Sequence, residues 1–236
     1  MRRKQKPVNA VTLLRKVPLF AGLSKDSLKR ITSITKSKVF KKGSIIFTEN
    51  TRGKTIYIVA SGRIKIFAEI FPGRKKTFVY LDKGEFFGEL ALLDKPTRSA
   101  SAQAVTACEL LFIEQKDFYK ILKQYAGVSL NLVVVLSHRL READKEIEYL
   151  SFHSILGRIA RVIVSMEKKY GVSRQDGRCI DMALDKKDIA ELIGTVREVA
   201  TRALKQLEKC CCIKFSGKKL YVTDLEKLKY IAGIKT

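Results

Sequence analysis

The sequence lacks both a segment apolar enough to cross a membrane and the cysteine pattern of a metal site. Even its most apolar stretches, such as Leu130–Leu136, are far shorter than the ~20 apolar residues that span a bilayer, and no apolar segment follows the basic N-terminus. Three of the five cysteines are adjacent (Cys210–Cys212), none belongs to a C-x-x-C pair, and His138 and His153 are solitary. We therefore expect a cytoplasmic protein without a membrane segment or a bound metal.

Acidic residues are also scarce. The chain has 24 Asp and Glu against 47 Lys and Arg, and its formal net charge of +23 is typical of a protein that binds a polyanion. Residues 1–76 hold 20 basic and 3 acidic residues, so the excess lies mainly in the first third, although charge alone does not say which part meets the polyanion. Since no nucleophile is matched with a general base, nothing predicts an enzyme.

A long helix is predicted at the centre of the chain, over Ser129–Leu150. Apolar residues recur there at alternating spacings of three and four, which is the heptad pattern of a helix that packs against one partner helix. An ordinary amphipathic helix packed on its own domain is the alternative. The heptad positions are Val133, Leu136, Leu140, Ala143, Ile147 and Leu150.

The chain before this helix has the pattern of a small antiparallel barrel or jelly roll. Ser24 is a candidate N-cap for a helix over Ser24–Ile34. Short segments rich in Ile, Val, Phe and Tyr then follow, separated by glycine-containing turns. The predicted strands are Ser44–Phe47, Thr55–Ala60, Ile64–Ile70, Thr77–Leu81 and Glu109–Ile113.

A candidate anion site lies within these strands. Gly84–Leu93 contains a short helix-forming run after a glycine, which exposes backbone N–H groups to an anion, and Arg98 can add a bidentate contact. Glu89 can accept hydrogen bonds from sugar hydroxyls. A purely structural ion pair between Glu89 and Arg98 is the alternative.

After the long helix, the sequence predicts a helix-turn-helix with a wing. Leu184–Gly194 forms a short helix that ends at its glycine, and Thr195–Glu198 has the form of a capping box that starts a second helix, extending to about Lys209. The exposed face of the second helix is either a surface for base edges or simply a solvated face. Ile213–Val222 is predicted as two strands around a Ser-Gly turn. The candidate DNA contacts are Thr195, Arg197, Glu198, Thr201, Arg202, Lys205, Lys214 and Lys218.

Two resemblances connect these parts. Phe87–Leu93 and Pro96–Ala100 resemble the phosphate-binding cassette of cyclic-nucleotide-binding domains, which implies that Arg98 and Ser99 hold the cyclic phosphate and that Glu89 holds the ribose 2′-hydroxyl. The whole order of domains is similar to the CRP/FNR family of transcription regulators. That resemblance implies that Arg197, Glu198 and Arg202 bind a TGTGA-like half-site, since arginine pairs with guanine and glutamate with cytosine. The implied ligand site comprises Gly88, Glu89, Leu90, Ala91, Arg98, Ser99, Arg139 and Asp144.

One departure from the family concerns the base of the nucleotide. Cyclic-AMP-binding members place a Thr-Ser pair against adenine, whereas Ala143 and Asp144 stand at the matching positions here. A carboxylate accepts hydrogen bonds but does not donate them, so Asp144 can take the adenine amino group or, better, the N–H pair of guanine. Cyclic AMP is nevertheless expected first, because it is the frequent ligand in the family. Cyclic GMP is expected second.

We predict an α+β protein with a cyclic-nucleotide-binding-type β-roll (jelly roll) over residues 1–125. A dimerisation helix follows over 126–152, and a winged helix-turn-helix over 153–236. The predicted function is a homodimeric transcription regulator that binds a palindromic operator in double-stranded DNA under the control of a cyclic nucleotide and contacts RNA polymerase. The alternative is a ligand-independent or redox-responsive regulator of the same architecture, with Cys210–Cys212 as thiol sensors.

Overall fold

The computed structural model describes residues 10–174, 177–217 and 219–234. The chain divides into two compact units, of which the first holds the chain up to Ala68 together with Phe78–Glu142. The second holds Glu69–Thr77 together with the chain from Ala143 onward. Among the helices in the described ranges, none combines the length and the apolar character that a membrane crossing requires.

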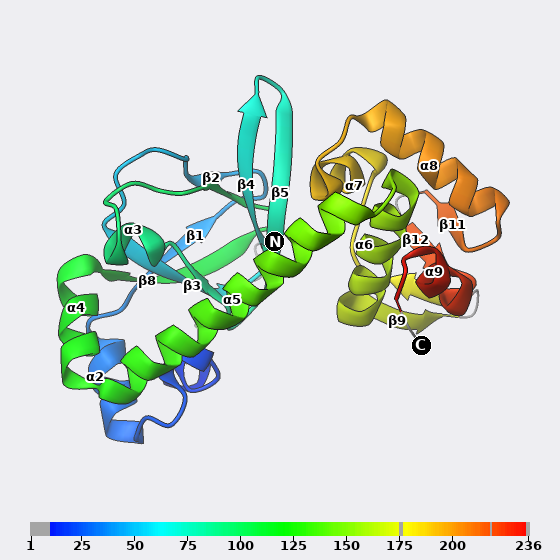
Figure 1. Ribbon diagram of the computed structural model, residues 1–236. Helices are drawn as coiled ribbons and strands as arrows, with labels where there is room; N and C mark the ends of the chain where they lie inside the picture. Colours follow the sequence, from blue (N-terminus) through cyan, green and yellow to red (C-terminus); the bar gives the residue numbers. More distant parts are fainter. Residues whose placement is uncertain (1–9, 175–176, 218, 235–236) are drawn as a thin grey trace. The chain divides into compact units, whose positions relative to one another are not determined.

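The first unit is built on an antiparallel β-roll (Figure 1). One sheet has the strand order β1-β8-β3-β6 and the other β2-β7-β4-β5. The predicted β-roll is confirmed, and every predicted strand segment is present with slightly different ends. The strands are β1 (Lys36–Phe40), β2 (Ile45–Phe47), β3 (Thr55–Ser61), β4 (Ile64–Phe71), β5 (Arg74–Leu81), β6 (Phe86–Phe87), β7 (Ser101–Ala104) and β8 (Cys108–Glu114).

Helices close the roll around an apolar core. Ser24 caps α2 as predicted, because its hydroxyl accepts a hydrogen bond from the Ser27 amide. Phe20, Phe86 and Phe118 are fully buried between these helices and the sheet. The helices are α1 (Ala10–Leu14), the 3-10 helix η1 (Pro18–Phe20), α2 (Lys25–Ser33), α3 (Leu90–Leu93), α4 (Gln115–Gln124) and α5 (Ala126–Phe152).

Helix α5 is the predicted long helix, and it has two kinds of apolar residue. Val128 and Leu132 are buried in the core of the roll. The heptad residues Val133, Leu140 and Ile147 are 60%, 63% and 62% exposed. The first turns of the helix therefore pack on their own domain, whereas the predicted seam leaves large apolar side chains exposed to solvent.

The second unit contains a winged helix-turn-helix. A four-stranded sheet of order β11-β12-β10-β9 stands beside four helices within the described ranges. Ile159, Leu204 and Leu207 are fully buried in its core. Its elements are α6 (Ile155–Tyr170), β9 (Gly171–Arg174), β10 (Gly177–Ile180), α7 (Lys186–Ile193), α8 (Arg197–Lys209), β11 (Ile213–Ser216), β12 (Lys219–Val222) and α9 (Leu225–Ile231).

The predicted capping box at Thr195 is wrong. Helix α8 begins at Arg197, with the extended residue Val196 as its N-cap and no side-chain capping bond. Gly194 adopts the left-handed conformation expected at the end of α7, with φ 71°, and the Thr195 amide donates to the Ala190 carbonyl oxygen. That bond ties Thr195 to the end of α7, so it lies one residue too early to cap α8.

Candidate ligand site and DNA-binding surface

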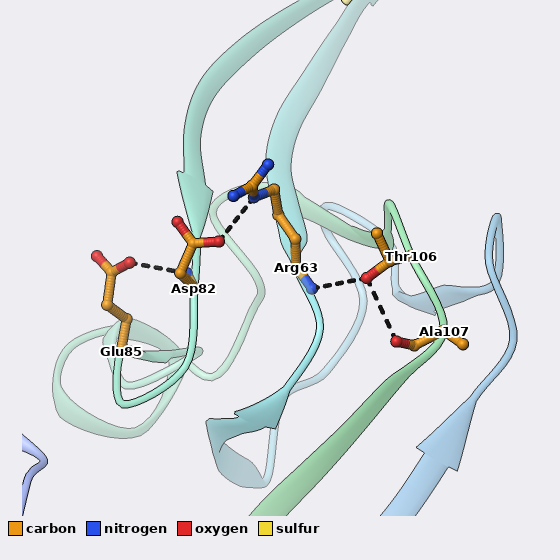
Figure 2. A network of polar contacts seen from close by, with 5 residues as sticks. All are labelled: Arg63, Asp82, Glu85, Thr106 and Ala107. Atoms are coloured by element: carbon orange, nitrogen blue, oxygen red, sulfur yellow. Dashed lines mark hydrogen bonds and ion pairs between the residues drawn. The ribbon is translucent and has the colours of Figure 1, made fainter. Parts of the chain in front are cut away.

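A polar network fixes the chain just before the candidate anion site (Figure 2). The Arg63 side chain donates to Asp82 Oδ1 over 2.6 Å, and its backbone N–H donates to Thr106 Oγ1 over 3.0 Å. The Asp82 amide donates to Glu85 Oε2 over 2.7 Å, and the Thr106 hydroxyl to the Ala107 carbonyl oxygen over 3.3 Å. Because β6 follows Glu85 directly, these bonds hold the start of the segment that leads to Glu89.

Arg98 lies inside the β-roll, and both terminal nitrogens of its guanidinium donate hydrogen bonds. Nη1 donates to the Gly88 carbonyl oxygen over 2.7 Å, and Nη2 donates to the Thr55 carbonyl oxygen over 3.0 Å and the Thr55 hydroxyl over 3.1 Å. The residue is only 4% exposed. Burial lowers the pKa of Arg98 from its ordinary value, because removing a cation from water disfavours its charged form, although Tyr57 and Glu89 act in the opposite direction.

Glu89 is equally buried and is held from α5. Arg139 Nη1 donates to Glu89 Oε1 over 2.7 Å, and Arg139 Nη2 donates to the Phe86 carbonyl oxygen over 2.7 Å. Glu89 is 2% exposed. Its ion pair is therefore made with Arg139 and not with Arg98, which was the structural alternative considered from the sequence.

Arg98 and Glu89 each have one polar atom without a hydrogen-bond partner among the described residues. Arg98 Nε and Glu89 Oε2 are buried, and neither has a hydrogen-bond partner in the part of the chain that the structure describes. Buried polar atoms usually have partners, so this unpaired donor and this unpaired acceptor are candidate contacts for a ligand. A cyclic nucleotide fits, since its phosphate accepts and its ribose hydroxyl donates.

The remaining predicted ligand residues differ in how far they are exposed to solvent. Gly88 has φ 82°, a conformation that favours glycine, and Ala91 is buried. Leu90 and Ser99 are exposed. Asp144 is an exposed residue of α5 that belongs to the second unit.

The sequence did not predict the contacts of Phe47 and Thr55 with Arg98. The Arg98 guanidinium carbon lies 4.1 Å from the centre of the Phe47 ring. Phe47 lies 51 residues before Arg98 in the chain, and Thr55 lies 43 residues before it. No local pattern of residues signals such a contact.

Helix α8 presents a charged face of the kind expected for DNA. Arg197, Glu198, Arg202 and Lys205 are exposed, whereas Thr195 and Thr201 are half-buried. The opposite face, which includes Ala200, Ala203, Leu204 and Leu207, is buried against the rest of the unit. In the wing, Lys214 is exposed, and Lys218 lies outside the described residues.

The cysteines near the end of α8 differ in exposure. Cys211 is exposed, Cys210 is half-buried and Cys212 is buried. Burial raises the pKa of the Cys212 thiol, which disfavours the reactive thiolate. Within the described ranges, no three His, Cys, Asp or Glu side chains are grouped so that they could hold a metal ion.

Comparison with known proteins identifies both units. The family model of the cyclic nucleotide-binding domain matches residues 37–125, and that of the Crp-like helix-turn-helix domain matches residues 157–231. The chain is 32% identical over 215 residues to the cyclic AMP receptor protein of Thermus thermophilus, covering 91% of this chain and 96% of that protein. It is 25% identical to the CRP-like cAMP-activated global transcriptional regulator of Mycobacterium tuberculosis, covering 92% and 96% respectively.

Solved structures agree on the fold. The c-di-GMP responsive global regulator CLP of Xanthomonas campestris superposes with a TM-score of 0.77 at 24% identity, covering 84% of this chain and 99% of that one. The catabolite activator protein of Thermus thermophilus has 31% identity and a TM-score of 0.54, covering 92% and 100%. The two units together define a transcription regulator with a cyclic-nucleotide-binding domain. The chain belongs to the CRP/FNR family.

Proposed function

We propose that this regulator binds a cyclic nucleotide at Arg98 and Glu89, with cyclic AMP the first candidate and cyclic GMP the second. The observation that carries this proposal is the buried pair of atoms without partners in the described chain, Arg98 Nε and Glu89 Oε2. A charge-assisted bond from Arg98 to a cyclic phosphate and a bond from the ribose 2′-hydroxyl to Glu89 complete both groups.

The other residues of the site have supporting roles. Ser99 and the backbone of Gly88–Ala91 add donors to the phosphate. Arg139 connects Glu89 to α5, since it donates to Glu89 Oε1 over 2.7 Å. A ligand hydroxyl that donates to Glu89 therefore alters the electrostatic partner of Arg139. Because Arg139 belongs to α5, this ion pair connects the site to the proposed dimer helix. Asp144 accepts from the base, either from the adenine amino group or from the N–H pair of guanine.

The DNA-binding function follows from helix α8. Its exposed Arg197, Glu198 and Arg202 contact base edges in the major groove, while Lys214 and Lys218 contact phosphates. Two copies of the chain, joined through α5, present two such helices about 34 Å apart to a palindromic operator. The ligand shifts the population of dimers toward the arrangement that fits DNA. RNA polymerase is the proposed partner at the promoter.

The first test is a calorimetric titration with cyclic AMP, cyclic GMP and, because of the related fold of the Xanthomonas campestris regulator, c-di-GMP. We expect one saturable site per chain for a cyclic mononucleotide. Arg98→Ala is expected to lose at least tenfold in affinity, since removal of one partner of a buried charge-assisted bond costs roughly 2–5 kcal/mol. Binding of c-di-GMP alone contradicts the proposed effector but leaves the regulator class intact.

The second part of the test measures fluorescence anisotropy of a labelled palindromic duplex with a TGTGA-like half-site. Arg98→Ala is expected to bind this DNA without any response to the nucleotide. Arg197→Glu is expected not to bind it, whereas the matched charge reversal Lys123→Glu, on α4 in the first unit, is expected to bind normally. DNA affinity that responds to oxidant and not to nucleotide points instead to the redox-responsive regulator.

A further inference from the structure

An aromatic cluster lies beneath the Arg98 guanidinium. It comprises Phe47 of β2, Tyr57 of β3 and Phe87 of β6, so it draws on both sheets of the roll. The ring centres are 5.8 Å apart for Phe47 and Tyr57, 5.8 Å for Phe47 and Phe87, and 5.3 Å for Tyr57 and Phe87. Three mutually packed rings form a rigid platform, because each ring restricts the rotation of the others.

The guanidinium lies over this platform at the distance of a cation–π contact. Its central carbon is 4.1 Å from the centre of the Phe47 ring and 5.8 Å from that of Tyr57. The negative face of an aromatic ring attracts a cation, most strongly when water is excluded. Arg98 meets that condition, since only 4% of its surface is exposed.

Nearby backbone atoms prevent the guanidinium from rotating within its own plane. A Cβ atom at Gly53 would lie 2.6 Å from Arg98 Nε, and one at Gly88 would lie 2.6 Å from Nη1. Thr55 adds two acceptors for Nη2, its carbonyl and its hydroxyl oxygen. Ring, carbonyl oxygens and glycines together restrict the group to one orientation, in which Nε has no partner among the described residues.

We propose that Phe47, supported by Tyr57 and Phe87, is a positioning residue that sets the affinity of this site for the cyclic phosphate. The inference rests on the proposed nucleotide site and adds a determinant of its strength. The platform holds Arg98 in its binding orientation before the ligand arrives, so less conformational entropy is lost on binding. Since cyclic AMP and cyclic GMP have the same cyclic phosphate, Phe47 affects both equally and has no influence on the choice between their bases.

The test compares the wild-type protein with Phe47→Leu and Phe47→Tyr by calorimetric titration with cyclic AMP and cyclic GMP. We expect Phe47→Leu to weaken both nucleotides by the same factor, about five- to thirty-fold, because without the cation–π contact the ligand itself must hold Arg98 in its binding orientation. The ratio of the two Kd values is expected to stay constant. Phe47→Tyr retains an aromatic face and is expected to bind within about twofold of the wild type.

Phe40→Leu is the matched control for lost packing. Phe40 is half-buried like Phe47 and packs against the same apolar cluster, but the cation over its ring is Lys38 and not Arg98. We expect this variant to keep the wild-type affinity. Equal losses in Phe40→Leu and Phe47→Leu, or normal binding by Phe47→Leu, would overturn the positioning role alone. A wild-type protein that binds neither nucleotide would overturn the proposed effector, and this inference with it.

Discussion

Arg98 and Glu89 are charged residues that the first unit buries almost completely. A cation and an anion that are each nearly inaccessible to water need partners, and both keep one polar atom without a partner in the described chain. Arg139 satisfies the other oxygen of Glu89, and Thr55 and Gly88 satisfy the other nitrogens of Arg98. The described chain therefore leaves Arg98 Nε and Glu89 Oε2 without partners, and the proposed nucleotide would supply them.

Gly88→Ala tests this arrangement at the residue scale. Gly88 has φ 82°, so any other residue adds about 1 kcal/mol of backbone strain, and the new methyl group would lie 2.6 Å from Arg98 Nη1. We expect a lower unfolding midpoint and a loss of at least tenfold in nucleotide affinity, measured by urea denaturation and calorimetry.

Gly73→Ala is the matched control for backbone strain. Gly73 has φ 78°, but a Cβ atom there would meet nothing within 4 Å. The control is therefore expected to lose similar stability and no affinity. Equal nucleotide affinity in the two variants would show that Arg98 does not need the space at Gly88.

At the scale of single elements, the helix-turn-helix depends on local capping. Asp185 Oδ1 accepts hydrogen bonds from the amides of Lys187 and Asp188, each over 2.8 Å, and the Asp188 side chain accepts from the Asp185 amide over 3.0 Å. This reciprocal pair is a capping box with Asp in both positions. The first helix of the motif thus has a strong start, whereas α8 begins without a capping side chain.

Asp185→Ala is therefore expected to destabilise the second unit by about 1 kcal/mol, the typical cost of a lost N-cap. Thr195→Ala, which removes the cap predicted from the sequence, is expected to change the free energy of unfolding by less than about 0.5 kcal/mol. Both values come from urea denaturation followed by circular dichroism. A cost at Thr195 as large as that at Asp185 would mean that its hydroxyl caps α8 in solution.

At the scale of the whole molecule, the exposed seam of α5 indicates a dimer. Leu140 is 63% exposed and Ile147 62%, and both belong to the predicted heptad pattern. Exposed apolar side chains at successive a and d positions are typical of a helix that a second helix covers. The chain belongs to the CRP/FNR family of transcription regulators, which share this architecture, and a dimer is consistent with that family.

Leu140→Asp is expected to yield monomers in sedimentation velocity and to lose operator binding, because a buried unpaired carboxylate in the seam costs several kcal/mol. His138→Asp introduces the same charge at an exposed position of α5, on the side of the heptad farthest from the seam, and is expected to remain dimeric. A dimeric Leu140→Asp protein that binds the operator normally would exclude this seam as the interface.

The sequence by itself determined the features that arise from short stretches of chain. Turn residues predicted the strands of the β-roll, Ser24 predicted the start of α2, Gly194 predicted the end of α7, and the Phe87–Ala100 segment carried the resemblance to a phosphate-binding cassette. Strand β1 was missed because almost all of its residues are exposed, so no alternation of apolar and polar residues reveals it.

Only the tertiary structure decided which partners the charged residues of the site acquire. The Arg98 guanidinium lies over the Phe47 ring of β2 and donates to the carbonyl oxygens of Thr55 and Gly88. Glu89 pairs with Arg139, 50 residues later in the chain. Residues so far apart meet only when the two sheets and α5 pack, and burial then makes each contact strong. For that reason the motif could be recognised from the sequence, whereas the aromatic support of its arginine could not.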